Sequence, residues 1–313
     1  MSGPKKKILV TGASGLLGLN FALHSCEAYE IVGVVNRNLL QELPFAIVQR
    51  DFFVPGTAAA LVDEIRPDAI LNCAAMANID SCEQNPEDAR WINGMVPGFF
   101  AEAAGKRSIP IVHISTDAVF DGQASGPNGY SETDPVRPIN SYAESKALGE
   151  RNVLSANPDA IVARVNFFGW SISGRRSLSE FFYTNLKAGR VVSGFMDVFF
   201  SPLYVRDLSR ILVRLLESSE RGVFHVFGAK TLSKYDFGVE IAKAFGFNPE
   251  NVRPTSWRDS GLATVRSPNL TMNIDRLTKF SGGNVPDAIA GIAGFRDDFK
   301  AGFPIKLWEH RWN

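Results

Sequence analysis

The chain has 313 residues, of which 45% are hydrophobic and 21% are charged, so it is long enough to bury a large core. Lysine plus arginine equal aspartate plus glutamate at 33 each, which excludes a whole-protein electrostatic attraction to nucleic acid or an anionic membrane. The first apolar run, ILV at 8–10, is too short for a signal-peptide core or a membrane span, so we expect a cytoplasmic protein.

Short β-branched and apolar runs alternate with longer helical patterns in the first half of the chain. The expected strands are 7–11, 30–35, 45–49, 69–75, 111–116 and 160–165. The expected helices are 16–28, 57–65, 86–106 and one that contains Tyr142. Near-continuous apolar strands separated by helices predict a parallel sheet covered on both faces, which is a doubly wound, Rossmann-type α/β fold.

After residue 166 the pattern loosens into shorter elements. Helices are expected at 178–188, 205–217 and 235–245, with a strand at 222–227. We interpret residues 1–166 as the main sheet domain and residues 167–313 as a smaller α/β lobe, interleaved with the first. The lobe is expected beside the carboxyl ends of the strands, where ligands of this fold lie.

A glycine-rich segment, TGASGLLG, joins the first expected strand to the first helix. Gly12, Gly15 and Gly18 let the backbone approach a pyrophosphate, whose charge meets free amides at the helix N-terminus. The loop residues Ser14, Leu16 and Leu17 belong to the same expected cofactor site. The alternative is a tight strand-to-helix turn without a ligand.

The end of the second strand, VVNRN, lacks the acidic residue that would hold both ribose hydroxyls of NAD. Asn36 and Arg37 offer an amide and a guanidinium instead, which favours the 2′-phosphate of NADP(H). Arg37 could equally be a surface arginine. Asp51 and Phe52 follow the third strand and are expected to line the adenine pocket, although an exposed loop aspartate is the competing interpretation.

Cysteine usage indicates neither a disulfide framework nor a metal site. Cys26, Cys73 and Cys82 are odd in number and lack C-x-x-C spacing, which favours reduced thiols.

Two pairs in this chain have a tyrosine four residues before a lysine, which places both side chains on one helix face. Tyr142 and Lys146 follow a strand that ends in a serine and Thr116, whereas Tyr183 and Lys187 follow no strand-end hydroxyl. A lysine ammonium beside a phenol favours the phenolate and lowers the tyrosine pKa, and the strand-end hydroxyl can bind the same carbonyl oxygen. We therefore predict a carbonyl-reduction site at Tyr142 and not at Tyr183.

The motifs TGASGLLG, NCAA, ISTDAVFDG, YAESK, ARVNFFG and VRSPNLTMNIDRL together resemble the extended short-chain dehydrogenase/reductase superfamily. Within it the chain is similar to the group around dTDP-4-dehydrorhamnose reductase. The resemblance covers nearly the whole chain. It implies that residues 1–166 bind NADP(H) and carry the catalytic residues, and that residues 167–313 bind substrate.

By position, the resemblance implies that Thr116, Tyr142 and Lys146 are the catalytic residues, the last two also contacting the cofactor. The NCAA stretch would pass beneath the nicotinamide ribose through Cys73, Ala74 and Ala75. The residues implied to face a nucleotide-sugar substrate are Asp117, Asn166, Trp170 and Arg266, with Arg266 on the diphosphate or, alternatively, on the surface.

The resemblance implies an NADPH-dependent reductase of a nucleoside-diphosphate 4-keto-6-deoxysugar, with the proton supplied by Tyr142. Two departures bear on the substrate. Ala118 replaces the usual aromatic residue after STD, and no glutamate follows Asp117, which disfavours a 4,6-dehydratase. A nucleotide-sugar epimerase is an alternative.

A second alternative is a non-catalytic, NADP-binding regulatory subunit. SKYDFGVEIAKAFGF and the ending LWEHRWN resemble the methionine adenosyltransferase beta subunit. Trp308, His310 and Trp312 would then form a partner-binding tail, unless they dock on their own domain. The superfamily resemblance also implies a homodimer, for which the apolar run MVPGFFAEAAG could supply a face or could equally be core.

Overall fold

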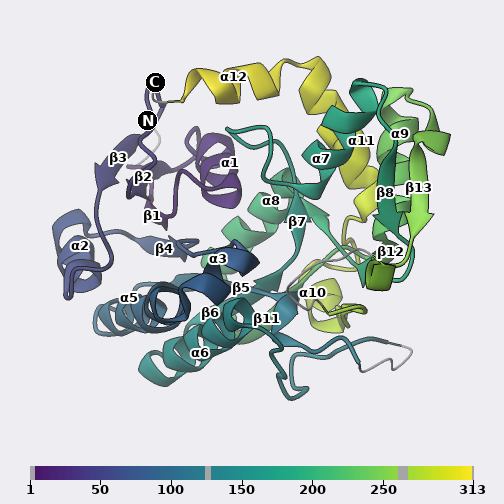
Figure 1. Ribbon diagram of the computed structural model, residues 1–313. Helices are drawn as coiled ribbons and strands as arrows, with labels where there is room; N and C mark the ends of the chain where they lie inside the picture. Colours follow the sequence, from purple (N-terminus) through teal and green to yellow (C-terminus); the bar gives the residue numbers. More distant parts are fainter. Residues whose placement is uncertain (1–3, 124–127, 260–266, 312–313) are drawn as a thin grey trace.

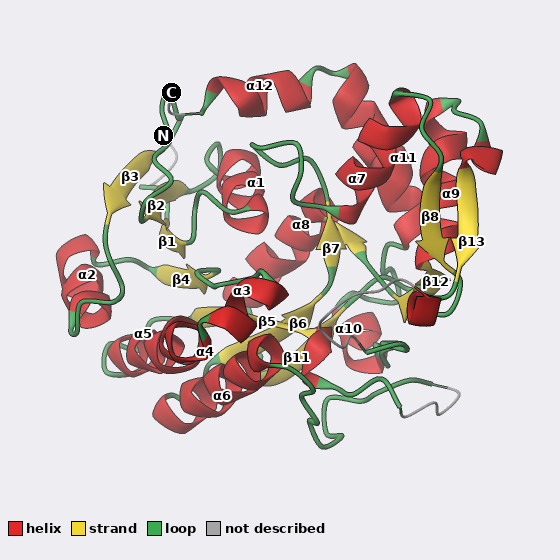
Figure 2. Cartoon of the chain, viewed as in Figure 1, coloured by secondary structure: helices red, strands yellow, loops and turns green. Residues whose placement is uncertain are grey.

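The computed structural model describes residues 4–123, 128–259 and 267–311. Its main sheet has seven parallel strands in the order β11-β6-β5-β4-β1-β2-β3 (Figure 2). In chain order the strands are β1 (Lys7–Thr11), β2 (Glu30–Val35), β3 (Ala46–Gln49), β4 (Ala69–Asn72), β5 (Ile111–Thr116), β6 (Ile161–Val165) and β11 (Gly222–Val226). The doubly wound α/β fold expected from the sequence is confirmed.

Helices cover both faces of this sheet (Figure 1). Helices α1 (Leu16–Ser25) and α8 (Val205–Leu216) pack together on one face. The other face carries α2 (Thr57–Ile65), α5 (Val96–Gly105) and α6 (Ser141–Ala156). Successive side chains of a strand point to opposite faces. Val10 therefore joins the core beneath α1, while Leu9 joins the core beneath α2 and α5.

The apolar run at 95–105 is core and not an open face. It lies in α5, which follows the short helices α3 (Ile79–Gln84) and α4 (Pro86–Ala89) and a π-helical turn, Arg90–Met95. Most of its side chains are buried against α6 within the same chain. A Cβ on Gly98 would lie 3.0 Å from the Cβ of Asn152, which shows how closely the two helices approach.

The smaller part of the chain lies beside the carboxyl ends of the main strands. Its two-stranded ladders are β7 (Phe167–Phe168) with β10 (Leu203–Tyr204), β8 (Val192–Phe195) with β13 (Val252–Thr255), and β9 (Phe199–Phe200) with β12 (Leu232–Ser233). Its helices are α7 (Leu178–Lys187), α9 (Lys234–Phe245), α10 (Asp275–Phe280), α11 (Ala288–Lys300) and α12 (Phe303–Glu309). Since β11 and α8 belong to the main sheet layer, the two segments are interleaved.

Helix α12 runs from the smaller part back over α1 towards β2 (Figure 1). Within the described ranges, none of the helices combines the length and the apolar character needed to cross a membrane.

Parallel pairing brings chemically active residues to one edge of the sheet. Thr11 at the end of β1 pairs with Asn72 at the end of β4, and Thr116 at the end of β5 pairs with Val165 in β6. The segments that follow these four strands therefore meet at the same edge.

Candidate functional site

A cavity of about 360 Å³ lies at the carboxyl ends of β1, β4, β5 and β6. It brings together most of the residues that the sequence predicted. Those that line it are Gly12, Gly15, Leu16, Leu17, Gly18, Cys73, Ala75, Thr116, Asp117, Tyr142, Lys146 and Asn166.

The glycine loop forms a bare backbone cradle at the start of α1. Gly12 has a φ of +65°, and a Cβ there would lie 2.9 Å from the backbone of Cys73 and Ala74. A Cβ on Gly18 would overlap the carbonyl oxygen of Gly12, and the Gly15 amide donates to that same oxygen at 2.9 Å. Only glycine fits at positions 12 and 18, and the cradle faces a helix N-terminus, so these residues fit the pyrophosphate of a dinucleotide.

Tyr142 and Lys146 are placed by the start of α6. The Asn140 side chain caps the helix by accepting a hydrogen bond from the Ala143 amide at 2.9 Å. Tyr142 follows in the first turn, where its hydroxyl is hydrogen-bonded to the Thr116 hydroxyl. Lys146 is buried one turn later and donates to the carbonyl oxygen of Ile114 at 2.6 Å.

The protonation of this pair differs from the sequence-based expectation. Burial raises the pKa of Tyr142 to about 12, although the hydrogen bond between its hydroxyl and Thr116 acts in the opposite direction. Burial lowers the pKa of Lys146 to about 8. The prediction that Lys146 brings the tyrosine pKa towards neutrality is wrong for this arrangement, because the ammonium bonds the Ile114 carbonyl and desolvation dominates.

Of the two hydroxyls at the end of β5, only Thr116 is directed at Tyr142. The Ser115 hydroxyl donates to Glu150 at 2.6 Å, and Glu150 is paired with Arg164 at 2.7 Å in the interior. The Ser115 hydroxyl therefore belongs to a structural network.

Asp117 lines the cavity beside Thr116 with a polar group. Its carboxylate accepts hydrogen bonds from the Asn166 amide at 2.6 Å and from the Thr116 hydroxyl at 3.0 Å. Burial raises the pKa of Asp117 despite these two bonds. The pair Asp117 and Asn166 thus presents directed polar groups to the side of the cavity opposite the glycine loop.

The residues expected at the adenosine end lie beyond this cavity. Arg37 and Ser14 line a second cavity of about 350 Å³. The Asn36 amide donates to the carboxylate of exposed Asp51 at 3.4 Å. The prediction that Phe52 lines the adenine pocket is wrong. Phe52 is 7% exposed and its ring packs edge-on against Phe100, so it is a core residue.

The expectation that Trp170 faces the sugar substrate is also wrong. Trp170 is 3% exposed, its ring stacks on Phe295 with centroids 3.9 Å apart, and its Nε1 donates to the Phe295 carbonyl oxygen at 2.9 Å. A residue so enclosed presents no surface to a sugar. Tyr183 packs edge-on against the same ring and does not line the cavity, in agreement with the sequence-based choice of Tyr142. Arg266, predicted to contact a diphosphate, lies outside the described residues.

Several residues that line the cavity were missed by the sequence reasoning, namely Ala77, Ile114, Val165, Phe167 and Arg176. Phe167 directly follows Asn166, so it could have been inferred from the same strand end. Arg176 lies in the GRRS loop, and its only signal was two adjacent arginines in a segment without periodicity.

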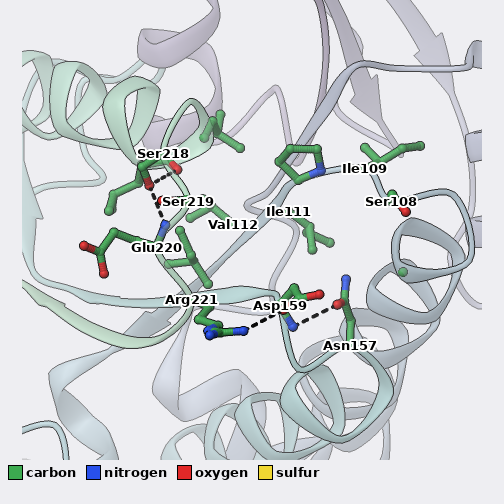
Figure 3. A pocket seen from close by; sticks show the side chains of 15 residues that line it. Ser108, Ile109, Ile111, Val112, Asn157, Asp159, Ser218, Ser219, Glu220 and Arg221 are labelled. Atoms are coloured by element: carbon green, nitrogen blue, oxygen red, sulfur yellow. Dashed lines mark hydrogen bonds and ion pairs between the residues drawn. The ribbon is translucent and has the colours of Figure 1, made fainter.

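A different cavity, of about 300 Å³, opens at the amino ends of the strands (Figure 3). Its walls include Ser108, Pro110, Asp159 and Arg221, and Arg221 is paired with Asp159 at 3.3 Å. Ligands of doubly wound folds bind at the carboxyl ends. The cavity at Tyr142 is therefore the candidate active site.

The comparison with protein families agrees with this geometry. Residues 6–299 match the family described as RmlD substrate binding domain. The chain belongs to the RmlD family. It is accordingly an NAD(P)-dependent reductase of the extended short-chain type.

Among its relatives, a probable low-salt glycan biosynthesis reductase of Haloferax volcanii is 30% identical over 301 residues, or 93% of this chain and 99% of that protein. The dTDP-4-dehydrorhamnose reductase of Mycobacterium tuberculosis is 30% identical over 263 residues, or 82% of this chain and 81% of that protein. The crystal structure of dTDP-4-dehydrorhamnose reductase from Bacillus anthracis, in complex with NADP, has a TM-score of 0.83 and 26% identity, and covers 94% of this chain and 99% of that chain.

Proposed function

We propose that this RmlD-family protein is an NADPH-dependent reductase of a nucleoside-diphosphate 4-keto-6-deoxysugar. The observation that carries the proposal is that one cavity joins the bare glycine cradle to Thr116, Tyr142 and Lys146. The names of its relatives, dTDP-4-dehydrorhamnose reductase and a glycan biosynthesis reductase, support the substrate class.

The cofactor would be bound by the loops that follow β1 and β4. The Gly12 to Gly18 loop would hold the pyrophosphate, and Cys73 to Ala75 would lie beneath the nicotinamide ribose. When bound, NADPH supplies a hydride to the carbonyl carbon. Arg37, at a position where NAD-preferring sites carry an acidic residue, supports a preference for NADP(H).

Proton transfer is the task of Tyr142. With a pKa of about 12, its hydroxyl stays protonated at neutral pH and can donate to the carbonyl oxygen of the substrate. Thr116 bonds the tyrosine hydroxyl and orients it. Lys146 keeps a positive charge one helical turn away, which stabilises the phenolate that the transfer leaves behind.

Asp117 and Asn166 would orient the sugar. Their mutual hydrogen bond of 2.6 Å fixes both side chains before a substrate arrives. Ala118 stands where the group usually has an aromatic residue, so the identity of the sugar is left to the assay. Arg266 remains a prediction for the diphosphate, and a homodimer remains a prediction for the assembly.

The regulatory-subunit alternative rested on the segment SKYDFGVEIAKAFGF and on the aromatic tail. Within that tail Trp308 is 41% exposed and Trp312 lies outside the described residues, so only His310 bears on its docking. His310 contacts Gln41 of the same chain: the Gln41 amide donates to the His310 carbonyl oxygen at 3.1 Å. The tail is therefore docked on its own domain as far as residue 311. No described contact favours the epimerase.

The proposal is tested by following NADPH oxidation with dTDP-, GDP- and UDP-linked 4-keto-6-deoxysugars. Tyr142→Phe is expected to lower kcat by about 100-fold or more while cofactor binding persists. Tyr183→Phe is the matched control, since it removes a hydroxyl at the same spacing from a lysine but away from the cavity, and it should retain turnover. Full activity in Tyr142→Phe on a substrate that the wild type reduces would refute the assigned mechanism.

A further inference from the structure

Three arginines from distant parts of the chain meet at the second cavity. Arg37 follows β2, Arg176 precedes α7, and Arg311 follows α12, and all three line this space of about 350 Å³ together with Ser14 of the glycine loop. Two of the three lie outside the first half of the fold, which carries the glycine loop.

The cluster carries uncompensated positive charge. None of the described residues that line the cavity is acidic, and none of the three guanidinium groups forms an ion pair within the described part of the chain. Arg176 donates one bond to the Ser14 carbonyl oxygen at 3.2 Å, and Arg311 donates its Nε to the Ile172 carbonyl oxygen. Each of these side chains is thereby oriented while other N–H groups stay available.

Arg311 is held there by a docked segment, which we call the C-terminal strap (residues 303–311). Leu40 and Arg311 form an antiparallel bridge, and the His310 ring nitrogen Nδ1 lies 3.2 Å from the Gln41 carbonyl oxygen. Leu307 is fully buried, and Phe303 stacks on His24 with centroids 5.3 Å apart. The strap therefore ties the end of the chain to the loop that carries Arg37.

We propose that the C-terminal strap is part of the cofactor site, and that Arg176 and Arg311 join Arg37 in binding the 2′-phosphate of NADP(H). The inference rests on the proposed function for the presence of the cofactor. Three arginines line one cavity of about 350 Å³, and arginine pairs with phosphate through two parallel hydrogen bonds.

The position of the cluster supports this ligand over a free-standing anion site. Ser14 belongs to the pyrophosphate cradle and also lines the arginine cavity. Arg176 lines both this cavity and the one at Tyr142. The two cavities are thus neighbours along the path a dinucleotide takes from the glycine loop to the end of β2.

The test uses binding and does not need turnover. Calorimetric titration of the full chain with adenosine 2′,5′-bisphosphate and with adenosine 5′-monophosphate separates the 2′-phosphate from the rest of the ligand. Arg311→Ala and Arg176→Ala should each lower the affinity for the bisphosphate by roughly tenfold. The affinity for the monophosphate should stay within about twofold of the wild-type value. The difference in bisphosphate affinity between wild type and each variant should shrink as salt is added, because the site is exposed.

Two controls separate the site from general charge and from folding. Arg175→Ala removes an adjacent exposed arginine that does not line the cavity, and Lys306→Ala removes a charge from the strap itself; neither should alter the affinity for the bisphosphate. Arg311→Lys retains the charge but lacks the planar guanidinium group, so its affinity for the bisphosphate should lie between those of wild type and Arg311→Ala.

Equal weakening of both ligands in Arg311→Ala or Arg176→Ala would overturn the proposal, since the residue would then act on the fold or the pyrophosphate. Unchanged affinity for the bisphosphate would overturn it as well. Failure of the proposed reductase activity is distinguishable, because it would appear as absent turnover with this binding pattern intact.

Discussion

The ammonium nitrogen of Lys146 lies 3.4 Å from Nε2 of His113, and both side chains are buried behind the proposed proton donor. On its other side His113 meets the Asn72 amide at 3.1 Å, and Asn72 accepts a hydrogen bond from the Thr11 hydroxyl at 2.6 Å. This polar chain connects the ends of β1 and β4 and the middle of β5 to α6. Burial and the nearby ammonium keep the pKa of His113 well below its usual value, so the imidazole is neutral while Lys146 carries the charge.

Lys146 gives the reaction a pH limit. Since burial lowers its pKa to about 8, the ammonium loses its proton as the pH rises through that value. The kcat/KM for carbonyl reduction should therefore fall on the alkaline side with an apparent pKa near this value, while Tyr142 is still protonated. A pH–rate profile measures it, and Lys146→Met should be slow at all pH values and lack this limb. An unchanged alkaline limb in Lys146→Met would assign the titration to another group.

His113 gives the fold a sensitivity to acid. Its folded-state pKa is depressed, so between that value and the unfolded pKa of about 6.5 only the unfolded chain binds the proton, and stability falls as pH falls. This histidine alone lowers the free energy of unfolding by up to about 1.4 kcal/mol for each pH unit below about pH 6.5.

His113→Gln tests this, because the amide can still meet Asn72 but cannot titrate. Urea unfolding at about pH 7.5 and about pH 5 should show a shallower loss of stability in the variant than in wild type. His225, whose pKa is lowered to about 3, is retained in both proteins and so cancels in the comparison. Equal pH dependence in the two proteins would contradict the assignment.

Gly12 should tolerate no side chain. Gly12→Ala strains a φ of +65° and places a Cβ 2.9 Å from the backbone of Cys73 and Ala74, so loss of NADPH binding by more than about tenfold is expected along with lower stability. Gly282→Ala is the matched control, because its φ is +70° but no atom lies within 4 Å of the new Cβ. Only the strain of about 1–2 kcal/mol is expected there, with cofactor binding intact. Fluorescence titration of NADPH distinguishes the two.

Trp170 should matter for stability and not for substrate binding. Trp170→Ala removes a ring stacked on Phe295 and is expected to lower the free energy of unfolding by about 3–5 kcal/mol, whereas KM for the sugar should change little. Phe181→Ala on α7 removes an aromatic ring that is 46% exposed and should cost far less. A raised KM at normal stability in Trp170→Phe would restore the substrate role that the sequence suggested.

The difference between Tyr142 and Trp170 shows where prediction from the sequence succeeds. Tyr142 lines the cavity as expected, because its position follows from short-range rules: a spacing of four on a helix and a strand that ends in a hydroxyl. Trp170 was misplaced because the sequence shows only that it follows a strand end. Whether its ring turns towards the cavity or towards Phe295 depends on residues 125 positions away. The prediction for Phe52 failed for the same reason, since Phe52 lies in the turn after β3 and its partner Phe100 lies on α5, far along the chain.

By itself the sequence determined the parallel α/β fold, the glycine cradle and the Tyr142–Lys146 pair, because alternating apolar runs, glycine and helical spacing act within a few residues of one another. Only the tertiary structure decided the protonation of that pair, since burial raises the pKa of Tyr142 and lowers that of Lys146. It alone brought Arg37, Arg176 and Arg311 to one cavity. Desolvation and the meeting of distant segments depend on how the whole chain packs, and no local pattern encodes that.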